Sequence, residues 1–215
     1  LALFYGLKFG EIAVWSVDKA EEEFELEGHD GPVWCMLVSG DCRTLVSASS
    51  DESVKVWCLE KRAEMASFET GVEAKSLSFL PGERRVSCGL EDGSIQVWNL
   101  DTKTKEFNLT DPGMTDEVLS LSISHDGKNM AAVCSGYDRI TVWNLETKVV
   151  VFTLKSEESI ERAAFSTEGE KIVSFQGWGR VEVWDCEDRD LAYHFAGHSE
   201  PVTALVMAGV WTAVF

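Results

Sequence analysis

The sequence predicts an all-β fold, a β-propeller of four-stranded antiparallel blades. Tryptophans recur with gaps of 42, 41, 45 and 41 residues, and a repeat of about 40–45 residues is typical of one propeller blade. The five tryptophans are Trp15, Trp57, Trp98, Trp143 and Trp184. The pairs Gly28-His29 and Gly197-His198 lie 169 residues apart, the separation that also holds between Trp15 and Trp184. Two independent landmarks therefore give the same repeat length.

The repeat that ends at Trp57 shows the expected order of elements within a blade. Short β-rich runs separated by turn residues predict four strands, which we name a to d in chain order. Their expected ranges are 33–38, 44–49, 53–58 and 63–68. Gly40-Asp41 and Asp51-Glu52 are the expected turns, because Gly and Asp tolerate turn dihedral angles.

The remaining repeats follow the same order. Strand a is expected at residues 74–79, 118–123, 160–165 and 202–207, and the a–b turns at Pro81-Gly82, Asp126-Gly127 and Glu168-Gly169. Near-continuous apolar runs at 131–133 and 149–152 predict strands that are covered on both faces.

We expect about five blades, forming a fragment of a larger propeller of about seven blades. The expected segments are the end of a blade at 1–18, full repeats at 19–58, 59–99, 100–144 and 145–185, and a truncated repeat at 186–215. An open ring would leave strand edges and apolar blade faces uncovered.

Charge and composition narrow the function classes. The net charge is −18, from 37 acidic and 19 basic residues, so nucleic acid is a disfavoured partner and basic partners are electrostatically favoured. The sequence contains no run of about 18 apolar residues, so no membrane helix is predicted. The six cysteines form no C-x-x-C pair, which favours a reducing, cytoplasmic location.

The motifs resemble those of the WD-repeat family. Trp57, which closes a strand, lies 28 residues after the His29 of Gly28-His29, and the typical Trp-Asp ending occurs at Trp184-Asp185. The resemblance implies a hydrogen-bonded tetrad in well-formed blades. Its members here would be His29, Ser47, Asp51 and Trp57. We expect a structural role for this tetrad, because a buried indole or imidazole without partners costs about 1–3 kcal/mol.

Catalytic, metal and cofactor sites are not expected. The sequence has no phosphate-binding G-x-x-x-x-G-K-[ST] loop, no H-E-x-x-H helix and no G-x-S-x-G elbow. His29, Ser47 and Asp51 have the residue types of a hydrolase triad, but nothing places an exposed serine on a strained turn. We therefore expect a protein that is not an enzyme and that has no small-molecule substrate.

Partner binding is expected at the loops around the central channel. In each blade, the residue after the first position of strand a should lie near these loops. Together with two residues of the b–c turns, these candidates are Trp34, Lys75, Leu119, Glu161, Thr203, Tyr137 and Trp178. Trp178, flanked by two glycines, is the sharpest candidate for an interface anchor. The alternative is that Trp178 packs into a neighbouring blade or fills the channel, and that Trp34 is packed within its blade.

The expected function is a non-catalytic scaffold or sensor for protein–protein interaction within a larger cytoplasmic protein. The repeat style also resembles the C-terminal WD-repeat arrays of NACHT-type signalling ATPases, which implies a regulatory array. The alternative is an adaptor subunit, such as a ubiquitin-ligase substrate receptor or a trafficking-coat component. An enzyme on a propeller scaffold is the third hypothesis.

Overall fold

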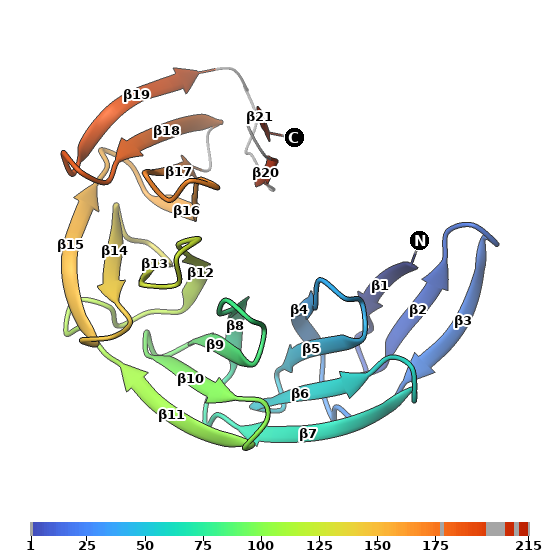
Figure 1. Ribbon diagram of the computed structural model, residues 1–215. Coiled ribbons are helices and arrows are strands. Elements are labelled where there is room, and N and C mark those ends of the chain that lie inside the picture. The colour runs from blue at the N-terminus through green and yellow to red at the C-terminus, as the bar shows by residue number, and fades with distance from the viewer. Residues whose placement is uncertain (1, 177–178, 197–204, 209–210, 215) are drawn as a thin grey trace. The chain divides into compact units, whose positions relative to one another are not determined.

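The structure is a computed structural model that describes residues 2–176, 179–196, 205–208 and 211–214. All regular elements in these ranges are β-strands, as Figure 1 shows. The chain divides into two compact units, one of residues 1–91 and 96–107, the other of residues 92–95 and 108–215.

The first unit consists of three sheets. The first sheet contains β1 (Ala2–Gly6), β2 (Ile12–Ser16) and β3 (Glu21–Leu26). The second contains β4 (Val33–Val38), β5 (Thr44–Ser49), β6 (Ser53–Cys58) and β7 (Ala63–Glu69). The third contains β8 (Ala74–Phe79), β9 (Arg85–Leu90), β10 (Ile95–Asn99) and β11 (Thr104–Leu109), and the boundary between the units runs through its ends.

The second unit continues the pattern. One sheet contains β12 (Val118–Ile123), β13 (Asn129–Cys134), β14 (Arg139–Asn144) and β15 (Val149–Lys155). The next contains β16 (Ile160–Phe165), β17 (Lys171–Gln176), β18 (Arg180–Asp185) and β19 (Asp190–Ala196). The last described strands, β20 (Leu205–Ala208) and β21 (Trp211–Val214), pair in an antiparallel hairpin.

Sequence neighbours are also spatial neighbours in every sheet, since the strands follow one another in chain order. The pairs within the β4–β7 and β12–β15 sheets are antiparallel. The strands expected at 33–38, 44–49 and 53–58 coincide with β4, β5 and β6. The predicted fold class, an all-β chain of four-stranded propeller blades, is confirmed.

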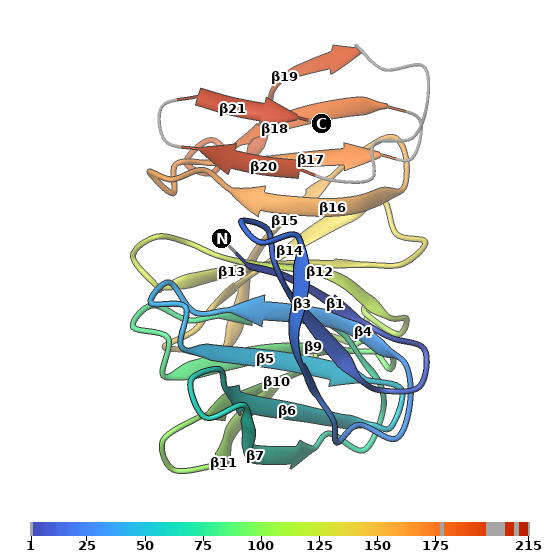
Figure 2. The same ribbon diagram turned by 90° about the vertical axis from the view of Figure 1, so that its right-hand side faces the viewer.

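The core lies between adjacent sheets of each unit. In the first unit, Val46 and Val54 of one sheet pack in one cluster with Val86 and Leu90 of the next. In the second unit, the sheets β12–β15 and β16–β19 form successive layers (Figure 2), and a cluster that includes Val142 joins them. The second strand of each blade, in the middle of the sheet, is almost entirely buried.

The prediction for one apolar run was wrong. Residues 131–133 are buried as expected, but Val149, Val150 and Val151 are 56%, 37% and 40% exposed. These valines lie on β15, the outermost strand of its sheet, which has a neighbouring strand on one side only. An outer strand has a neighbouring strand along one edge only, so apolar character alone does not predict its burial.

Candidate functional site

The first strand of each complete sheet carries one extra residue, a β-bulge. In β4 the pairing with β5 passes from Val33↔Ser49 to Cys35↔Ala48, so Trp34 has no cross-strand partner. The same shift leaves out one residue in β8, β12 and β16, and the four bulged residues are Trp34, Lys75, Leu119 and Glu161. A bulge redirects a side chain out of the regular alternation of a strand. Four of the seven candidate partner-binding residues therefore share one backbone irregularity.

Trp34 and Lys75 come together in the first unit. The Trp34 side chain is 50% exposed, and its indole N–H donates to Glu73 Oε2 at 2.9 Å. Lys75 Nζ lies 4.5 Å from the centroid of the Trp34 ring and also forms an ion pair with Glu73. The alternative that Trp34 is packed within its blade is wrong, because half of its surface is open.

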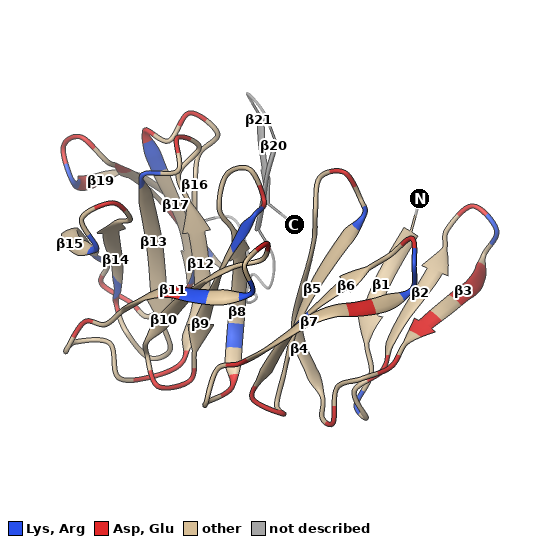
Figure 3. Ribbon diagram, turned by 60° about the horizontal axis from the view of Figure 1, so that its bottom comes forward, with Lys and Arg blue, Asp and Glu red and all other residues tan. Residues whose placement is uncertain are grey.

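Acidic residues surround this contact. The backbone N–H of Glu91 donates to Glu73 O at 2.9 Å, and that of Thr70 donates to Glu52 O at 3.0 Å, so two b–c turns are tied to the d–a loop between β7 and β8. Exposed carboxylates in these loops belong to Asp30, Glu52 and Glu91. In Figure 3 the loop ends carry mostly red. The d–a loops and b–c turns of the first unit thus carry several exposed carboxylates.

The second unit presents different side chains at the equivalent positions. Glu161 is exposed and Leu119 is half-buried, with the Leu119 carbonyl accepting a hydrogen bond from Arg162 Nη1 at 3.1 Å. The Tyr137 hydroxyl lies 2.8 Å from Thr115 Oγ1, and the Arg139 guanidinium lies 5.4 Å from the Tyr137 ring centroid. The other two candidates, Trp178 and Thr203, lie outside the described residues.

His29, Ser47, Asp51 and Trp57 form a continuous hydrogen-bonded chain. Trp57 Nε1 donates to Ser47 Oγ at 2.8 Å. His29 Nε2 lies 2.7 Å from Ser47 Oγ, and His29 Nδ1 lies 2.8 Å from Asp51 Oδ2. Because the Asp51 carboxylate can only accept, His29 Nδ1 donates to it, and Nε2 of the neutral ring accepts the hydrogen of the Ser47 hydroxyl. Ser47 is 0% exposed, so its hydroxyl cannot meet a substrate.

The ionisation of this tetrad follows from its burial. Burial lowers the pKa of His29 below its ordinary value of 6.5, against the opposing effect of the Asp51 carboxylate. Burial alone would raise the pKa of Asp51, but hydrogen bonds from Ser53, the Asp30 amide and His29 together lower it to about 2. At neutral pH the pair is therefore a neutral imidazole that donates to a carboxylate.

The sequence analysis did not predict which residues accept the indole N–H of the tryptophans in other blades. The Trp98 indole donates to Gln96 Oε1 at 3.1 Å, and the Gln96 amide donates onward to Thr70 O. Trp184 donates to Ser174 Oγ at 2.9 Å. Ser47 and Ser174 both lie ten residues before their tryptophans, and this spacing was a usable signal. Gln96 carried no such signal.

The Trp143 indole N–H has no hydrogen-bond partner among the described residues, although the ring is 3% exposed. Val133 stands ten residues before Trp143, where Ser47 stands before Trp57. Met114 stands at the position that His29 occupies in the repeat ending at Trp57. Neither replacement offers the strong acceptor that the tetrad provides, so this blade keeps the tryptophan for its packing.

Two hollows in the first unit lie towards the a–b and c–d turns, at the other end of strand a from the bulges. The larger, of about 840 Å³, is lined by Ala2, Phe4, Val14, Glu23, Phe24, Val38, Cys42, Arg43, Leu59 and Glu60. The smaller, of about 500 Å³, is lined by Thr44, Val56, Met65, Ala66, Glu83, Arg84, Leu100, Asp101 and Lys103. Arg84 and Leu100 each lie 41 residues after their counterparts Arg43 and Leu59, so the hollows occupy equivalent places.

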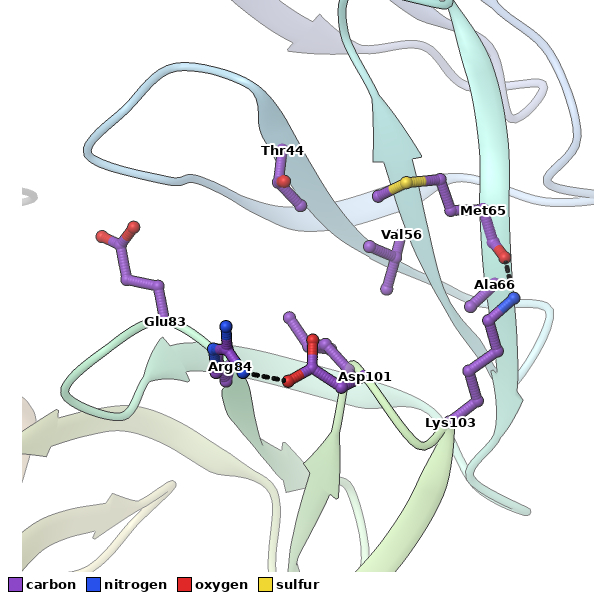
Figure 4. A pocket seen from close by; sticks show the side chains of 9 residues that line it. Thr44, Val56, Met65, Ala66, Glu83, Arg84, Asp101 and Lys103 are labelled. Carbon is purple, nitrogen blue, oxygen red and sulfur yellow. Dashed lines mark hydrogen bonds and ion pairs between the residues drawn. The ribbon is translucent and has the colours of Figure 1, made fainter.

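Figure 4 shows the polar closure of the smaller hollow. Arg84 Nη1 donates to Asp101 Oδ2 at 3.0 Å, and Lys103 Nζ donates to the carbonyl of Met65. Met65 is the bulged residue of β7, left out between Val56↔Ala66 and Trp57↔Glu64, which frees its carbonyl. Arg84 and Asp101 thus pair with each other, and Lys103 binds a backbone carbonyl, beside the apolar side chains of Val56, Ala66 and Leu100.

In the part of the chain that the structure describes, no group of three or more His, Cys, Asp or Glu side chains has the arrangement of a metal site. No helix there is long and apolar enough to cross a membrane. None of the six cysteines forms a disulfide, and burial raises the pKa of the Cys134 thiol to about 12.

Comparisons with known proteins agree with this geometry. Residues 20–58 and 66–99 match the family model described as WD domain, G-beta repeat. Over 186 residues the chain is 27% identical to transcription factor unc-37 of Caenorhabditis elegans, covering 86% of this chain and 30% of that protein. Over 194 residues it is 26% identical to the WD repeat-containing protein WDS homolog of Arabidopsis thaliana, covering 87% and 37%.

A third relative is apoptotic protease-activating factor 1 of Homo sapiens. The chain is 27% identical to it over 175 residues, which cover 80% of this chain and 14% of that protein. The chain thus spans well under half the length of these relatives. The matched repeats, the four-stranded sheets and the tetrad at Trp57 lead to one conclusion: the chain is a WD-repeat protein.

Proposed function

We propose that this chain is a non-catalytic module for protein–protein interaction within a larger cytoplasmic protein. Its contact surface in the first unit consists of the bulges at Trp34 and Lys75 and the adjoining b–c turns. The observation that carries the proposal is the half-exposed Trp34 on the β4 bulge, fixed through its indole N–H by Glu73. The similarity to WD-repeat proteins of several kinds supports the same general role.

Trp34 has the properties of an interface anchor. Tryptophan is enriched among the residues that carry most of the binding energy at interfaces. A side chain held in place before binding also loses less conformational entropy when a partner arrives. The hydrogen bond to Glu73 and the Lys75 contact hold Trp34 in this way, while half of the ring surface remains open to a partner.

The burial of the tetrad supports a non-catalytic role. His29, Ser47 and Asp51 together have the residue types of a hydrolase triad, but the Ser47 hydroxyl is buried and bonded to both Trp57 and His29. A nucleophile must reach the substrate carbon, and this one is enclosed by its own partners. The tetrad is therefore assigned to stability.

Electrostatics favour a basic partner. The chain carries a net charge of −18, and the carboxylates of Asp30, Glu52 and Glu91 lie exposed in the loops near Trp34. Complementary charge speeds diffusional encounter and suppresses binding of anionic partners. Nucleic acid, with its phosphate backbone, is correspondingly disfavoured.

The larger protein is proposed to be a NACHT-type signalling ATPase, of which this chain is part of the regulatory array. Similarity to a protein named apoptotic protease-activating factor 1 supports this choice. A G-x-x-x-x-G-K-[ST] motif upstream in the full-length sequence is the expected result. An F-box-like or long helical segment in its place would favour the adaptor alternative, a ubiquitin-ligase substrate receptor or a trafficking-coat component.

The binding surface is tested in the full-length protein by quantitative partner capture. We expect Trp34→Ala to lose its partner without a change in melting temperature. Met65→Ala is the matched control, because Met65 is also exposed but lies on the β7 bulge, away from the strand-a bulges. Partner binding that is lost in Met65→Ala and kept in Trp34→Ala would reject this surface.

A further inference from the structure

The contact between Trp34 and Lys75 has the composition of an occupied cation site. The Lys75 ammonium lies 4.5 Å from the centroid of the Trp34 ring, within the range of a cation–π interaction. Glu73 Oε2 accepts the Trp34 indole N–H and also forms the ion pair with Lys75. One aromatic face and one carboxylate thus meet a single cation, which the neighbouring blade's own bulge supplies.

We infer that the Trp34 ring and the Glu73 carboxylate bind the guanidinium of an arginine on a partner protein, and that Lys75 occupies this site until the arginine displaces it. The inference rests on the proposed function, since it names the partner chemistry that the same surface recognises. It goes further by assigning Lys75 the role of an internal competitor.

The site is better suited to guanidinium than to the ammonium that now fills it. A guanidinium is planar, stacks on aromatic faces and forms directed hydrogen bonds to carboxylates, whereas an ammonium is a compact and strongly hydrated charge. The hydrogen bond to Glu73 fixes the edge of the Trp34 ring, so the ring and the carboxylate are positioned before a guest arrives.

Displacement is feasible because Lys75 reaches the site on a long, flexible side chain. Its side chain is 17% exposed, so it has access to water from its present position. The exposed carboxylates of Asp30, Glu52 and Glu91 raise the local concentration of any cation and receive the released ammonium without repulsion. When the arginine displaces Lys75, one cation replaces another at Glu73, so the Glu73 carboxylate keeps a positively charged partner throughout.

The test uses this chain with ¹⁵N-labelled tryptophan indoles, followed by NMR. The Trp34 signal is assigned by its loss in Trp34→Phe, since the chain has eight tryptophans. The probe is the capped peptide acetyl-Gly-Arg-Gly-amide, and its control is the same peptide with citrulline, which is nearly isosteric but uncharged. We expect the arginine peptide to shift the Trp34 signal saturably and the citrulline peptide to leave it unchanged.

Two variants separate displacement from simple attraction. Lys75→Ala is expected to tighten arginine binding about three- to tenfold, because it removes the internal competitor and raises the fraction of open sites. Glu73→Gln keeps an acceptor for the indole N–H but removes the charge, and is expected to weaken binding about tenfold. Unchanged or weaker affinity in Lys75→Ala, or equal binding of the citrulline peptide, would overturn the inference.

The outcomes also distinguish this inference from the proposed function. If the arginine peptide fails to shift Trp34 while Trp34→Ala still loses its protein partner, the cation site is wrong and the interaction surface stands. If the peptide binds as expected while Trp34→Ala keeps its partner, the cation site stands and the proposed surface is wrong.

Discussion

The indole N–H of Trp57 donates to Ser47 Oγ at 2.8 Å, and through Ser47 it joins His29 and Asp51 in one buried network. Trp143 closes the equivalent strand of a later blade and is buried to a similar degree, at 3% exposed against 1% for Trp57. Its indole N–H has no partner among the described residues. The same residue type at the same repeat position is thus bonded in one blade and only packed in another.

Replacing each of these two tryptophans by phenylalanine measures the difference. Both variants lose part of a buried ring, but only Trp57→Phe also removes a hydrogen bond and leaves the Ser47 hydroxyl without its donor. We expect Trp57→Phe to lower the free energy of unfolding by about 1–2 kcal/mol more than Trp143→Phe does. Urea denaturation followed by circular dichroism gives both values. Equal losses would show that the tetrad contributes packing alone.

The low pKa of His29 predicts acid sensitivity. The unfolded chain takes up a proton near pH 6.5, whereas folded His29 resists protonation because burial lowers its pKa. Its contribution to stability is therefore complete above pH 6.5 and is lost as the pH falls towards the folded pKa. Urea midpoints measured across this range should decline in the wild type and stay flatter in His29→Gln.

Asp51 titrates in a separate, lower window. Its pKa is lowered from 3.8 to about 2, so its contribution is present above pH 3.8 and is lost as the pH falls through about 2. Ser53 and the Asp30 amide still donate to Asp51 when His29 is absent. His29→Gln should therefore keep the second decline while losing the first. Loss of both together would contradict the assignment of the two windows.

Two glycines with nearly the same backbone angle differ in the space around them. Gly93 has φ +82° and Gly82 has φ +84°, but a Cβ on Gly93 would lie 2.3 Å from Met114 O, whereas nothing lies within 4 Å of one on Gly82. Gly82→Ala should cost about 1–2 kcal/mol, from the left-handed conformation alone. Gly93→Ala should cost clearly more, since backbone must also move. Similar melting temperatures for the two variants would refute the close contact.

The exposed valines of β15 should tolerate charge. Val149→Lys is expected to change the free energy of unfolding by less than about 0.5 kcal/mol, because the side chain already faces water. Val142→Lys, on the adjacent strand β14, is the matched control and should prevent stable folding, since Val142 is 0% exposed. Thermal unfolding compares the pair. A large loss in Val149→Lys would show that β15 is covered.

The strand layout was predictable because the tryptophans recur at regular intervals and the turn residues lie directly beside the strands that they separate. The expected strands at 74–79, 118–123 and 160–165 coincide with β8, β12 and β16. The burial of β15 was not predictable in this way, since its position as an outer strand depends on the sheet order and not on its own composition.

The candidate site was predictable only in part. Counting from the start of strand a placed Trp34 and Lys75 at equivalent positions, but that count does not reveal a bulge, which depends on the register between two strands. The Lys75–Trp34 contact joins side chains 41 residues apart through Glu73. Such a contact depends on the packing of two blades, about which the local sequence carries no information.

The central claim is that Trp34 serves binding whereas Trp57 serves stability, and one paired measurement tests it most directly. Melting temperature and affinity for the captured partner are measured for Trp34→Ala and Trp57→Phe. The account predicts that Trp34→Ala weakens binding at least about tenfold with an unchanged melting temperature, and that Trp57→Phe lowers the melting temperature while the folded variant binds normally. A lower melting temperature with intact binding in Trp34→Ala would contradict the account.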